Sequence, residues 1–185
     1  MPSAQDKPKR RVLAEGKYLR LLDEAGWEIV ERLNCTGIVA LAPVTDDGYL
    51  VLVEQYRRAP GVRVLELPAG LVGDLAGQAN EAMLEAAYRE LLEETGYAAS
   101  ELKWLFKGPT SPGGMAEIVD FYLATGLKRV HAGGGDEHED IKVHLAPVAT
   151  LEAWLSQTLH PGLMLDPKVY MGAWFARQWL AYRQG

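Results

Sequence analysis

Three glutamates, Glu90, Glu93 and Glu94, stand at spacings i, i+3 and i+4 in the chain. On an α-helix this spacing places all three carboxylates on one face, about one turn apart. Like charges in this arrangement repel by roughly a few tenths of a kcal/mol per pair, so the helix gains nothing from them. A hard divalent cation such as Mg²⁺ takes carboxylate oxygens as ligands and would turn the repulsion into attraction. A solvated acidic helix face is the other interpretation of such a triplet.

The residues around the triplet predict one amphipathic helix that begins near Asn80 and ends at Gly96. Glycine is common just after the last helical residue, where the backbone becomes left-handed. Glu81 falls in the first turn, where a negative charge suits the helix dipole. Apolar residues at helical spacing form the expected buried stripe: Leu84, Ala87, Tyr88 and Leu91.

Apolar runs separated by turn residues predict strands on both sides of this helix. Residues 23–26 and 45–48 have turn composition, so we expect each to join two strands in a hairpin. The predicted strands are 11–22, 27–33, 35–44, 49–56, 63–67, 102–107, 118–124 and 141–146, and two further helices are predicted at 151–159 and 167–182. Strands interleaved with helices in this way suggest an α/β/α sandwich.

Length and composition narrow the class of protein. A chain of 185 residues suits one domain, or one domain with a small appendage. The formal net charge of −6 argues against a surface that coats nucleic acid. The single cysteine, Cys35, allows neither a disulfide framework nor a cysteine-based zinc site. No apolar run approaches the ~20 residues that span a bilayer, and residues 1–11 lack the apolar core of a secretory signal. We therefore expect a cytoplasmic protein that binds neither nucleic acid nor membrane.

Residues 81–97 resemble the signature of the Nudix hydrolases, which requires Glu, seven residues, Arg-Glu, an aliphatic residue, any residue, Glu-Glu, any residue, Gly and an apolar residue. Every one of these positions matches from Glu81 to Tyr97. The signature also places a glycine at position 75, where this chain has Leu75, whereas Gly70 ends a Glu-Leu-Pro-Ala-Gly run that is similar to the segment leading into the signature. We therefore expect a loop five residues longer than usual between Gly70 and the helix.

The resemblance implies a fold and a chemistry. It implies a Nudix-type sandwich with a mixed sheet from about Cys35 to the C-terminus, preceded by a small N-terminal antiparallel strand region. It also implies hydrolysis of a phosphoanhydride with Mg²⁺, or with Mn²⁺ as the alternative cation. The implied metal ligands are the carboxylates of the acidic triplet and the carbonyl of Ala69. Arg89 is expected to orient these carboxylates rather than to contact the substrate.

A general base is also needed, and residues 133–140 form a glycine-hinged acidic segment before a predicted strand. Taken alone, this segment has the composition of a solvated loop. It resembles the catalytic loop of ADP-ribose pyrophosphatases, in which a glutamate activates water. The alignment favours Glu137 as the base, with Glu139 second. His138 has a suitable pKa for a base, but the alignment gives it no role.

Several residues resemble the ligand contacts of the ADP-ribose branch. Pro112 lies sixteen residues after the glycine that ends the helix, a spacing that marks this branch, and Gly113 follows it. Arg57, in a Glu-Gln-Tyr-Arg run, and Arg32 resemble arginines that contact the ligand, and arginine pairs well with phosphate. Trp27 resembles a residue that stacks on the nucleobase, and its packing in the core is an equal alternative.

The runs at 111–114, 132–135 and 139–141 are similar to GDP-mannose pyrophosphatases as well. Enzymes of both branches cleave a diphosphate that joins a nucleoside to a sugar, and both are dimers in which the N-terminal strands of one subunit help to build the site of the other. The resemblance therefore implies a homodimer. It divides the chain into residues 1–34, for dimerisation and completion of the substrate site, and residues 35–185, the hydrolase domain.

Three functions remain open on the sequence. The first is hydrolysis of ADP-ribose to AMP and ribose 5-phosphate, and the second is hydrolysis of GDP-mannose or another nucleotide sugar. The third is a nucleotide-sugar sensor that does not hydrolyse its ligand. The longer loop and the missing glycine at position 75 leave this function open, and the complete acidic triplet argues against it. The chain has neither a P-loop nor a dinucleotide-binding glycine fingerprint, so ATPase and oxidoreductase functions have no support.

Overall fold

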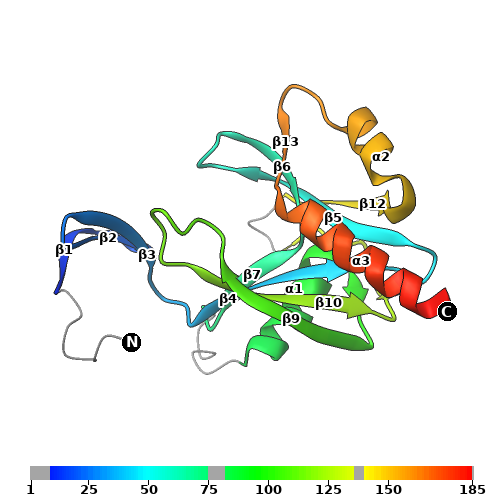
Figure 1. Ribbon diagram of the computed structural model, residues 1–185, viewed down its shortest axis with the longest axis horizontal. Coiled ribbons are helices and arrows are strands. Elements are labelled where there is room, and N and C mark those ends of the chain that lie inside the picture. Colours follow the sequence, from blue (N-terminus) through cyan, green and yellow to red (C-terminus); the bar gives the residue numbers. More distant parts are fainter. Residues whose placement is uncertain (1–8, 75–81, 136–139, 185) are drawn as a thin grey trace.

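The computed structural model describes residues 9–74, 82–135 and 140–184. Figure 1 shows a body of strands and helices from which an N-terminal sheet projects to one side. This N-terminal sheet is an antiparallel meander of β1 (Arg10–Glu15), β2 (Leu19–Glu24) and β3 (Trp27–Arg32).

Within the residues that the structure describes, the body contains two four-stranded mixed sheets and a small two-stranded one. The first has the order β7-β4-β10-β9, with β10 parallel to β4 and the other pairs antiparallel. The second has the order β12-β5-β6-β13, with β13 parallel to β6. The bounds are β4 (Gly37–Pro43), β5 (Tyr49–Arg57), β6 (Val62–Glu66), β7 (Ala69–Val72), β9 (Glu101–Pro109), β10 (Ile118–Thr125), β12 (Lys142–Pro147) and β13 (Leu163–Leu165), with β8 (Tyr97–Ala98) and β11 (Lys128–Arg129) as the short pair.

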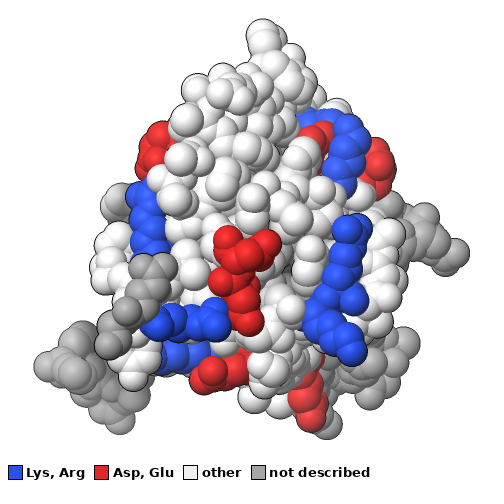
Figure 2. Space-filling view, turned by 90° about the vertical axis from the view of Figure 1, so that its right-hand side faces the viewer, with Lys and Arg blue, Asp and Glu red and all other residues white. Residues whose placement is uncertain are grey.

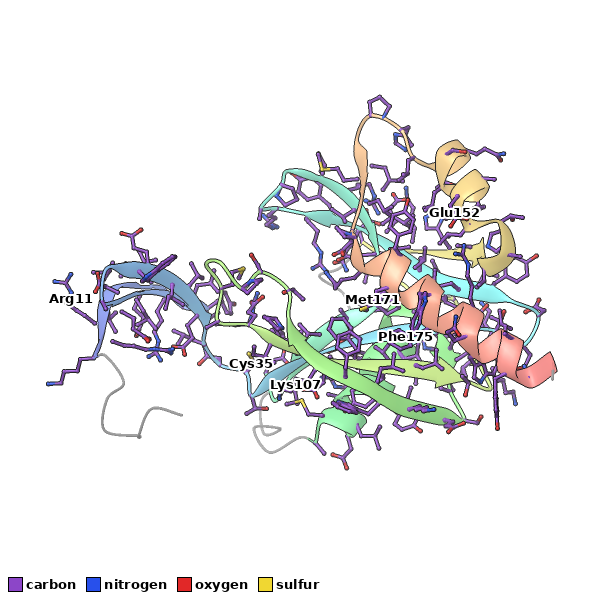
Figure 3. The ribbon with its side chains drawn as sticks, in the orientation of Figure 1. Arg11, Cys35, Lys107, Glu152, Met171 and Phe175 are labelled. Atoms are coloured by element: carbon purple, nitrogen blue, oxygen red, sulfur yellow. The ribbon has the colours of Figure 1, made fainter. Side chains whose placement is uncertain are left out.

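Helices cover both faces of the first sheet. The helix α1 (Met83–Thr95) packs on one face and α3 (Lys168–Gln184) on the other, while α2 (Leu151–Thr158), which follows a 3₁₀ turn at Val148–Thr150, packs near β12. Alternation along β4 fits this arrangement, because successive side chains of a strand point to opposite faces. Val39 and Leu41 join the cluster under α1, and Ala42 joins the cluster under α3. Met171 and Phe175 extend from α3 toward the sheet, as Figure 3 shows.

This architecture confirms the predicted α/β sandwich with a mixed sheet and an N-terminal antiparallel region. The prediction of one strand over residues 11–22 is wrong, because the chain turns at Gly16, whose N–H donates to the Leu19 carbonyl at 2.8 Å, and so makes three strands in place of two. Strands at residues 69–72, 97–98, 128–129 and 163–165 were not predicted; each has four residues or fewer. Runs this short carry almost no periodic signal.

The predicted hairpin of residues 35–44 and 49–56 is also wrong. The turn itself forms, since the Gly48 N–H donates to the Thr45 carbonyl at 3.0 Å, and a single bridge joins Val44 to Leu50. Beyond this bridge β4 and β5 diverge into different sheets. Both strands are buried over most of their length, so each lies between two neighbours of its own rather than pairing with the other.

The predicted stripe of α1 needs a partial correction. Ala87 and Leu91 are fully buried, but Leu84 is 44% exposed and Tyr88 is 38% exposed. The buried face instead continues through Glu94. The core-facing side of α1 is therefore rotated toward the acidic triplet.

One face of the described part carries charges of both signs (Figure 2). Figure 2 shows one face on which acidic and basic side chains are interspersed among uncharged residues. Within the described residues, none of the helices has both the length and the apolar character that crossing a bilayer requires.

Candidate active site

A cleft of about 740 Å³ opens where the two main sheets, β3 and the N-terminal end of α3 come together. Its lining includes backbone and side chains of β7 at Ala69 and Gly70, and the carboxylate-bearing residue Glu90 of α1. Arg32 of β3 and Arg57 of β5 line the same cleft. Four residues predicted for the site from the sequence, Arg32, Arg57, Ala69 and Glu90, are therefore neighbours in the fold.

Helix α1 ends at a glycine whose backbone has the left-handed conformation. Gly96 has φ of 74°, and its N–H donates to the Leu92 carbonyl at 2.9 Å. A side chain at this position would also collide with the passing chain, because a Cβ would lie 2.2 Å from the carbonyl oxygen of His131. Gly96 thus ends the helix and lets the segment at residues 131–135 dock against it.

Glu94 is the most deeply buried of the three glutamates, with 2% of its surface exposed. Its Oε2 accepts a hydrogen bond from the Ala69 N–H at 3.0 Å. This bond joins α1 to the first residue of β7. It therefore places the Ala69 backbone and the Glu94 carboxylate side by side, two of the groups that the family resemblance assigns to the metal.

Arg89 connects the other two glutamates. Its Nη1 donates to Glu90 Oε1 at 2.8 Å and to Glu93 Oε2 at 3.1 Å, and its Nη2 donates to the Leu71 carbonyl at 3.1 Å. Asp74 stands 3.9 Å from the same guanidinium. Arg89 is thus bonded to two carboxylates of the triplet and to the backbone of β7. It is not among the residues that line the cleft.

Burial raises the pKa of Glu90 to about 7. The neighbouring Arg89 lowers this pKa, and the negative charges of Glu93 and Asp74 raise it, but removal of the carboxyl group from water is the largest effect. At neutral pH, Glu90 is thus poised between its neutral and ionised forms. Any cation that binds beside it would favour the ionised form.

The donor atoms fit a hard divalent cation in their chemistry. The triplet supplies carboxylate oxygens from one helical face, and Gly70 leaves the space that the Glu90 carboxylate occupies, since a Cβ there would overlap it. The side chains do not converge in advance, however. Across the described ranges, no group of three or more acidic, histidine or cysteine side chains is arranged around one point. Glu90 and Glu93 are drawn to Arg89, and Glu94 is drawn to the backbone.

Glu137 and Glu139, the predicted bases, lie outside the described residues, but the residues that flank them are described. The N–H groups of Gly134 and Gly135 donate to the Glu94 and Glu93 carbonyls, each at 3.0 Å. On the other side, Asp140 accepts a hydrogen bond from Arg63 Nη1 at 2.7 Å. The acidic segment therefore starts against the end of α1 that carries the glutamates.

Arg32 and Arg57 each form an ion pair inside the cleft. Arg32 Nε donates to Glu117 Oε1 at 2.8 Å, and Arg57 Nε donates to Glu66 Oε1 at 2.7 Å. Burial raises the pKa of Glu66, and the nearby Arg57 opposes this increase. These arginines are therefore held in fixed positions at the cleft wall.

The other predicted substrate contacts lie elsewhere. Trp27 is 70% exposed at the start of β3, so the alternative that it packs in the core is wrong. Pro112 and Gly113 are exposed in the loop between β9 and β10, which is tied to β3 by hydrogen bonds from the Val30 N–H to Gly114 O at 2.8 Å and from the Ala116 N–H to Val30 O at 2.9 Å. None of the three lines the cleft of this chain.

The cleft also contains residues that were not predicted for the site from the sequence. They include Gly70 and the charged residues Glu66, Asp74, Glu117, Asp166 and Lys168. Two signals were available. Glu66 begins the Glu-Leu-Pro-Ala-Gly run that leads to Gly70, and Asp166 precedes Pro167 at the start of α3, a position at which Asp caps a helix. Nothing local in the sequence indicates that these two residues share one cleft.

Known proteins similar to this chain include two pyrophosphatases and an activator of a dehydrogenase. A methanol dehydrogenase activator of Bacillus methanolicus is 40% identical over 104 residues, which cover 56% of this chain and 54% of that protein. An ADP-ribose pyrophosphatase of Mycobacterium tuberculosis is 42% identical over 123 residues (66% and 56%), and a GDP-mannose pyrophosphatase of an Enterobacter species is 41% identical over 124 residues (63% and 61%). The matches span little more than half the length of these relatives.

The fold has a counterpart among solved structures. The crystal structure of an ADP compounds hydrolase superposes with a TM-score of 0.67, covering 98% of each chain at 23% identity. At this identity the likeness concerns the fold alone. A model of the NUDIX domain matches residues 36–163, more than half of the 185 residues, and the chain therefore belongs to the NUDIX domain family, as residues 81–97 predicted.

Proposed function

We propose that this protein is a Mg²⁺-dependent pyrophosphatase that hydrolyses the diphosphate of a nucleoside diphosphate sugar, with ADP-ribose as the first candidate. The observation that carries the proposal is the placement of Glu90. It stands in the 740 Å³ cleft with a pKa of about 7, on the helix face that also bears Glu93 and Glu94. The pyrophosphatase names of two relatives support the same chemistry.

Each of the predicted site residues would have its own role in the hydrolysis. The three glutamates and the Ala69 carbonyl would hold Mg²⁺, or Mn²⁺ in its place, and Arg89 would keep Glu90 and Glu93 in position. Bound Mg²⁺ would neutralise the diphosphate and lower the pKa of a water molecule. Glu137, or Glu139 as the second choice, would accept the proton of that water. The water oxygen would attack one phosphorus while the bridging P–O bond breaks, which releases AMP and ribose 5-phosphate from ADP-ribose.

We also propose that the protein works as a homodimer. Trp27, Pro112 and Gly113 are exposed and lie outside the cleft of their own chain. The projecting sheet β1–β3 could bring such residues to the cleft of a second copy (Figure 1). In this arrangement residues 1–34 would serve dimerisation and substrate binding, with Trp27 stacking on the nucleobase, and residues 35–185 would form the hydrolase domain. On composition we propose a cytoplasmic location and a small-molecule partner rather than nucleic acid or membrane.

The substrate test is a panel of nucleotide sugars. ADP-ribose, GDP-mannose and related compounds are incubated with Mg²⁺ and alkaline phosphatase, and released phosphate is measured. We expect ADP-ribose to be the best substrate. A preference for GDP-mannose, the compound in the name of the Enterobacter relative, would keep the chemistry and change the substrate. Tight binding of a nucleotide sugar without turnover would favour the sensor.

The residue test is Glu94→Gln. Glutamine retains an oxygen that can accept the Ala69 N–H, so we expect the fold to persist and most activity to be lost. Glu85→Gln, an exposed glutamate in the first turn of the same helix, is the control. Near-normal turnover in Glu94→Gln would show that the assignment of the metal ligands is wrong.

The Bacillus methanolicus relative is named as an activator of methanol dehydrogenase, which adds a candidate of another class. A methanol dehydrogenase assayed with and without this chain tests it. Stimulation that survives Glu94→Gln would favour activation by binding, and stimulation that is lost with hydrolysis would make activation a consequence of the hydrolase.

A further inference from the structure

The cations that line the cleft are all paired with carboxylates that line it too. The described lining contains three cations, and each makes a hydrogen-bonded ion pair within the cleft. The pairs are Arg32 with Glu117, Arg57 with Glu66, and Lys168 with Asp166.

The carboxylates of these pairs are held firmly. In every pair the carboxylate side chain is less exposed than its cation, and Glu66 is almost fully buried. A buried carboxylate that loses its partner is costly, so each cation is kept where it is. Asp166 has a second bond, because its Oδ1 accepts the Lys168 N–H at 2.7 Å at the start of α3.

Among the described residues, the lining of the cleft has more acidic than basic side chains. Asp74 and Glu90 also line the cleft, which gives five carboxyl groups against three cations. A diphosphate can enter such a site when a divalent cation accompanies it. An additional phosphate would meet carboxylates whose cations are already engaged, and it would have to break an ion pair to find a partner.

An uncharged sugar meets no such obstacle. Each ion pair offers carboxylate oxygens that accept a hydrogen bond from a hydroxyl group and N–H groups that donate one to a hydroxyl oxygen. A sugar can use both without changing the charge of the pair. The same pairs therefore favour a hydroxyl-rich group and oppose a further phosphate.

We infer, on the basis of the proposed function, that Glu66, Glu117 and Asp166 determine which substrates the cleft accepts. They restrict the site to diphosphates that end in an uncharged, hydroxyl-bearing group and exclude compounds with an additional phosphate. ADP-ribose and ATP make the comparison direct, because both contain adenosine and a diphosphate. After the diphosphate, ADP-ribose has a ribose, whereas ATP has a third phosphate.

The test measures kcat/KM for ADP-ribose and for ATP in Mg²⁺ with the full-length protein. The wild type should prefer ADP-ribose. In Asp166→Asn, the amide oxygen still caps α3, but Lys168 loses its counter-charge. We expect Asp166→Asn and Glu117→Gln each to shift the ratio toward ATP by about tenfold. Glu152 lies on α2, outside the lining of the cleft (Figure 3), and Glu152→Gln, which weakens its ion pair with Arg177 of α3, should leave the ratio unchanged.

The ratio separates specificity from folding, since a smaller amount of folded protein lowers both rates alike. Equal wild-type rates for the two compounds, or ratios in both cleft variants that match the Glu152→Gln control, would overturn the inference and leave the hydrolase intact. If the wild type cleaves neither compound, ADP-ribose is not its substrate, whereas hydrolysis of another nucleotide sugar would keep the proposed chemistry. The same ratio of dissociation constants, measured by calorimetry in Mg²⁺, then decides the inference.

Discussion

The backbone of Gly70 lies against the carboxylate of Glu90, so closely that a Cβ at position 70 would stand 1.8 Å from the Glu90 Cδ. Gly70 belongs to β7, and Glu90 belongs to α1, which packs on β7. The glycine therefore does more than lead into a loop. It provides the space in which the carboxylate sits at the cleft wall.

Gly70→Ala should remove activity with little effect on stability. The added methyl group meets the end of a flexible side chain, so Glu90 can swing away at small cost to the fold. The displaced carboxylate then leaves the position at which it would bind the metal, and misplacement of this kind costs about 10²-fold in rate. Turnover of ADP-ribose and the unfolding temperature are measured on the same sample.

Gly108→Ala on β9 is the matched control. A Cβ at Gly108 makes only ordinary contacts, the nearest at 3.7 Å from Phe106. It should change neither turnover nor the unfolding temperature appreciably. If Gly70→Ala were as active as Gly108→Ala, the position of the Glu90 carboxylate would not matter for the reaction.

Arg89→Lys should also impair the reaction, because arginine here bonds three groups at once. One nitrogen serves Glu90 and Glu93 while the other serves the Leu71 carbonyl. A lysine ammonium is a single point of charge that cannot keep this fork geometry. We expect kcat/KM to fall by about tenfold or more with a folded protein.

Arg177→Lys makes the same exchange in an ion pair remote from the cleft, with Glu152 of α2. It should behave like the wild type in turnover. Equal activities of Arg89→Lys and Arg177→Lys would argue that Arg89 is only a surface ion pair.

The sequence predicted α1 well because the information for that helix is local. The spacing of Glu90, Glu93 and Glu94 and the glycine at 96 lie within one short segment, and the helix ends where expected. The prediction of a hairpin from residues 35–44 and 49–56 was wrong, because strand pairing depends on residues that are far apart in the sequence. The Asp-Gly turn formed, but β4 took β7 and β10 as neighbours.

The residues of the candidate site also fall into those identified from local motifs and those that only tertiary packing brings together. Arg32, Arg57, Ala69 and Glu90 were identified from short motifs, and the fold brings them to one cleft. Asp166 and Lys168 come from the start of the last helix, nearly eighty residues after Glu90. Their approach depends on the packing of α3 against the sheets, which no local pattern encodes. The rotation of α1 that exposes Leu84 likewise follows from tertiary packing.

The raised pKa of Glu90 predicts how metal binding depends on pH. Below pH 7 the metal-free carboxyl group holds a proton that a cation must displace, so apparent Mg²⁺ affinity should fall by about tenfold per pH unit. Above pH 7 it should level off. Calorimetric titration of Mg²⁺ between pH 5.5 and 8.5 measures it, and Glu90→Gln should flatten the dependence. An affinity that stays level over this whole range, as the ordinary pKa of 4.5 would give, would contradict the pKa assigned to this group.

The same shift has a consequence for stability without metal. The folded protein holds the Glu90 proton more tightly than the unfolded chain, so stability falls as pH rises from 4.5 to about 7. The full cost, up to about 3 kcal/mol, is present above pH 7 and absent well below 4.5. Glu90→Gln should therefore raise the unfolding temperature of the metal-free protein at pH 8 and not at pH 4. A rise at both pH values would indicate improved packing instead.

The projecting sheet predicts how the protein assembles. All six residues of β1 are exposed, and among them Val12 is 49% and Leu13 is 41% exposed. The pairing of β1 with β2 shifts register between Val12 and Ala14, and the double variant Val12→Asp/Leu13→Asp puts a charge at both exposed apolar positions. A charge without a partner in an apolar interface is costly, and we expect the wild type to be a dimer and the variant a monomer with a higher KM. Light scattering during size-exclusion chromatography measures the oligomeric state, and ADP-ribose kinetics measure KM.

The control variant is Tyr182→Asp, at an 86% exposed position near the end of α3, which should stay dimeric and active. A double variant that remains a fully active dimer would remove β1 from the interface, and with it the reason to place Trp27 in the cleft of a second copy.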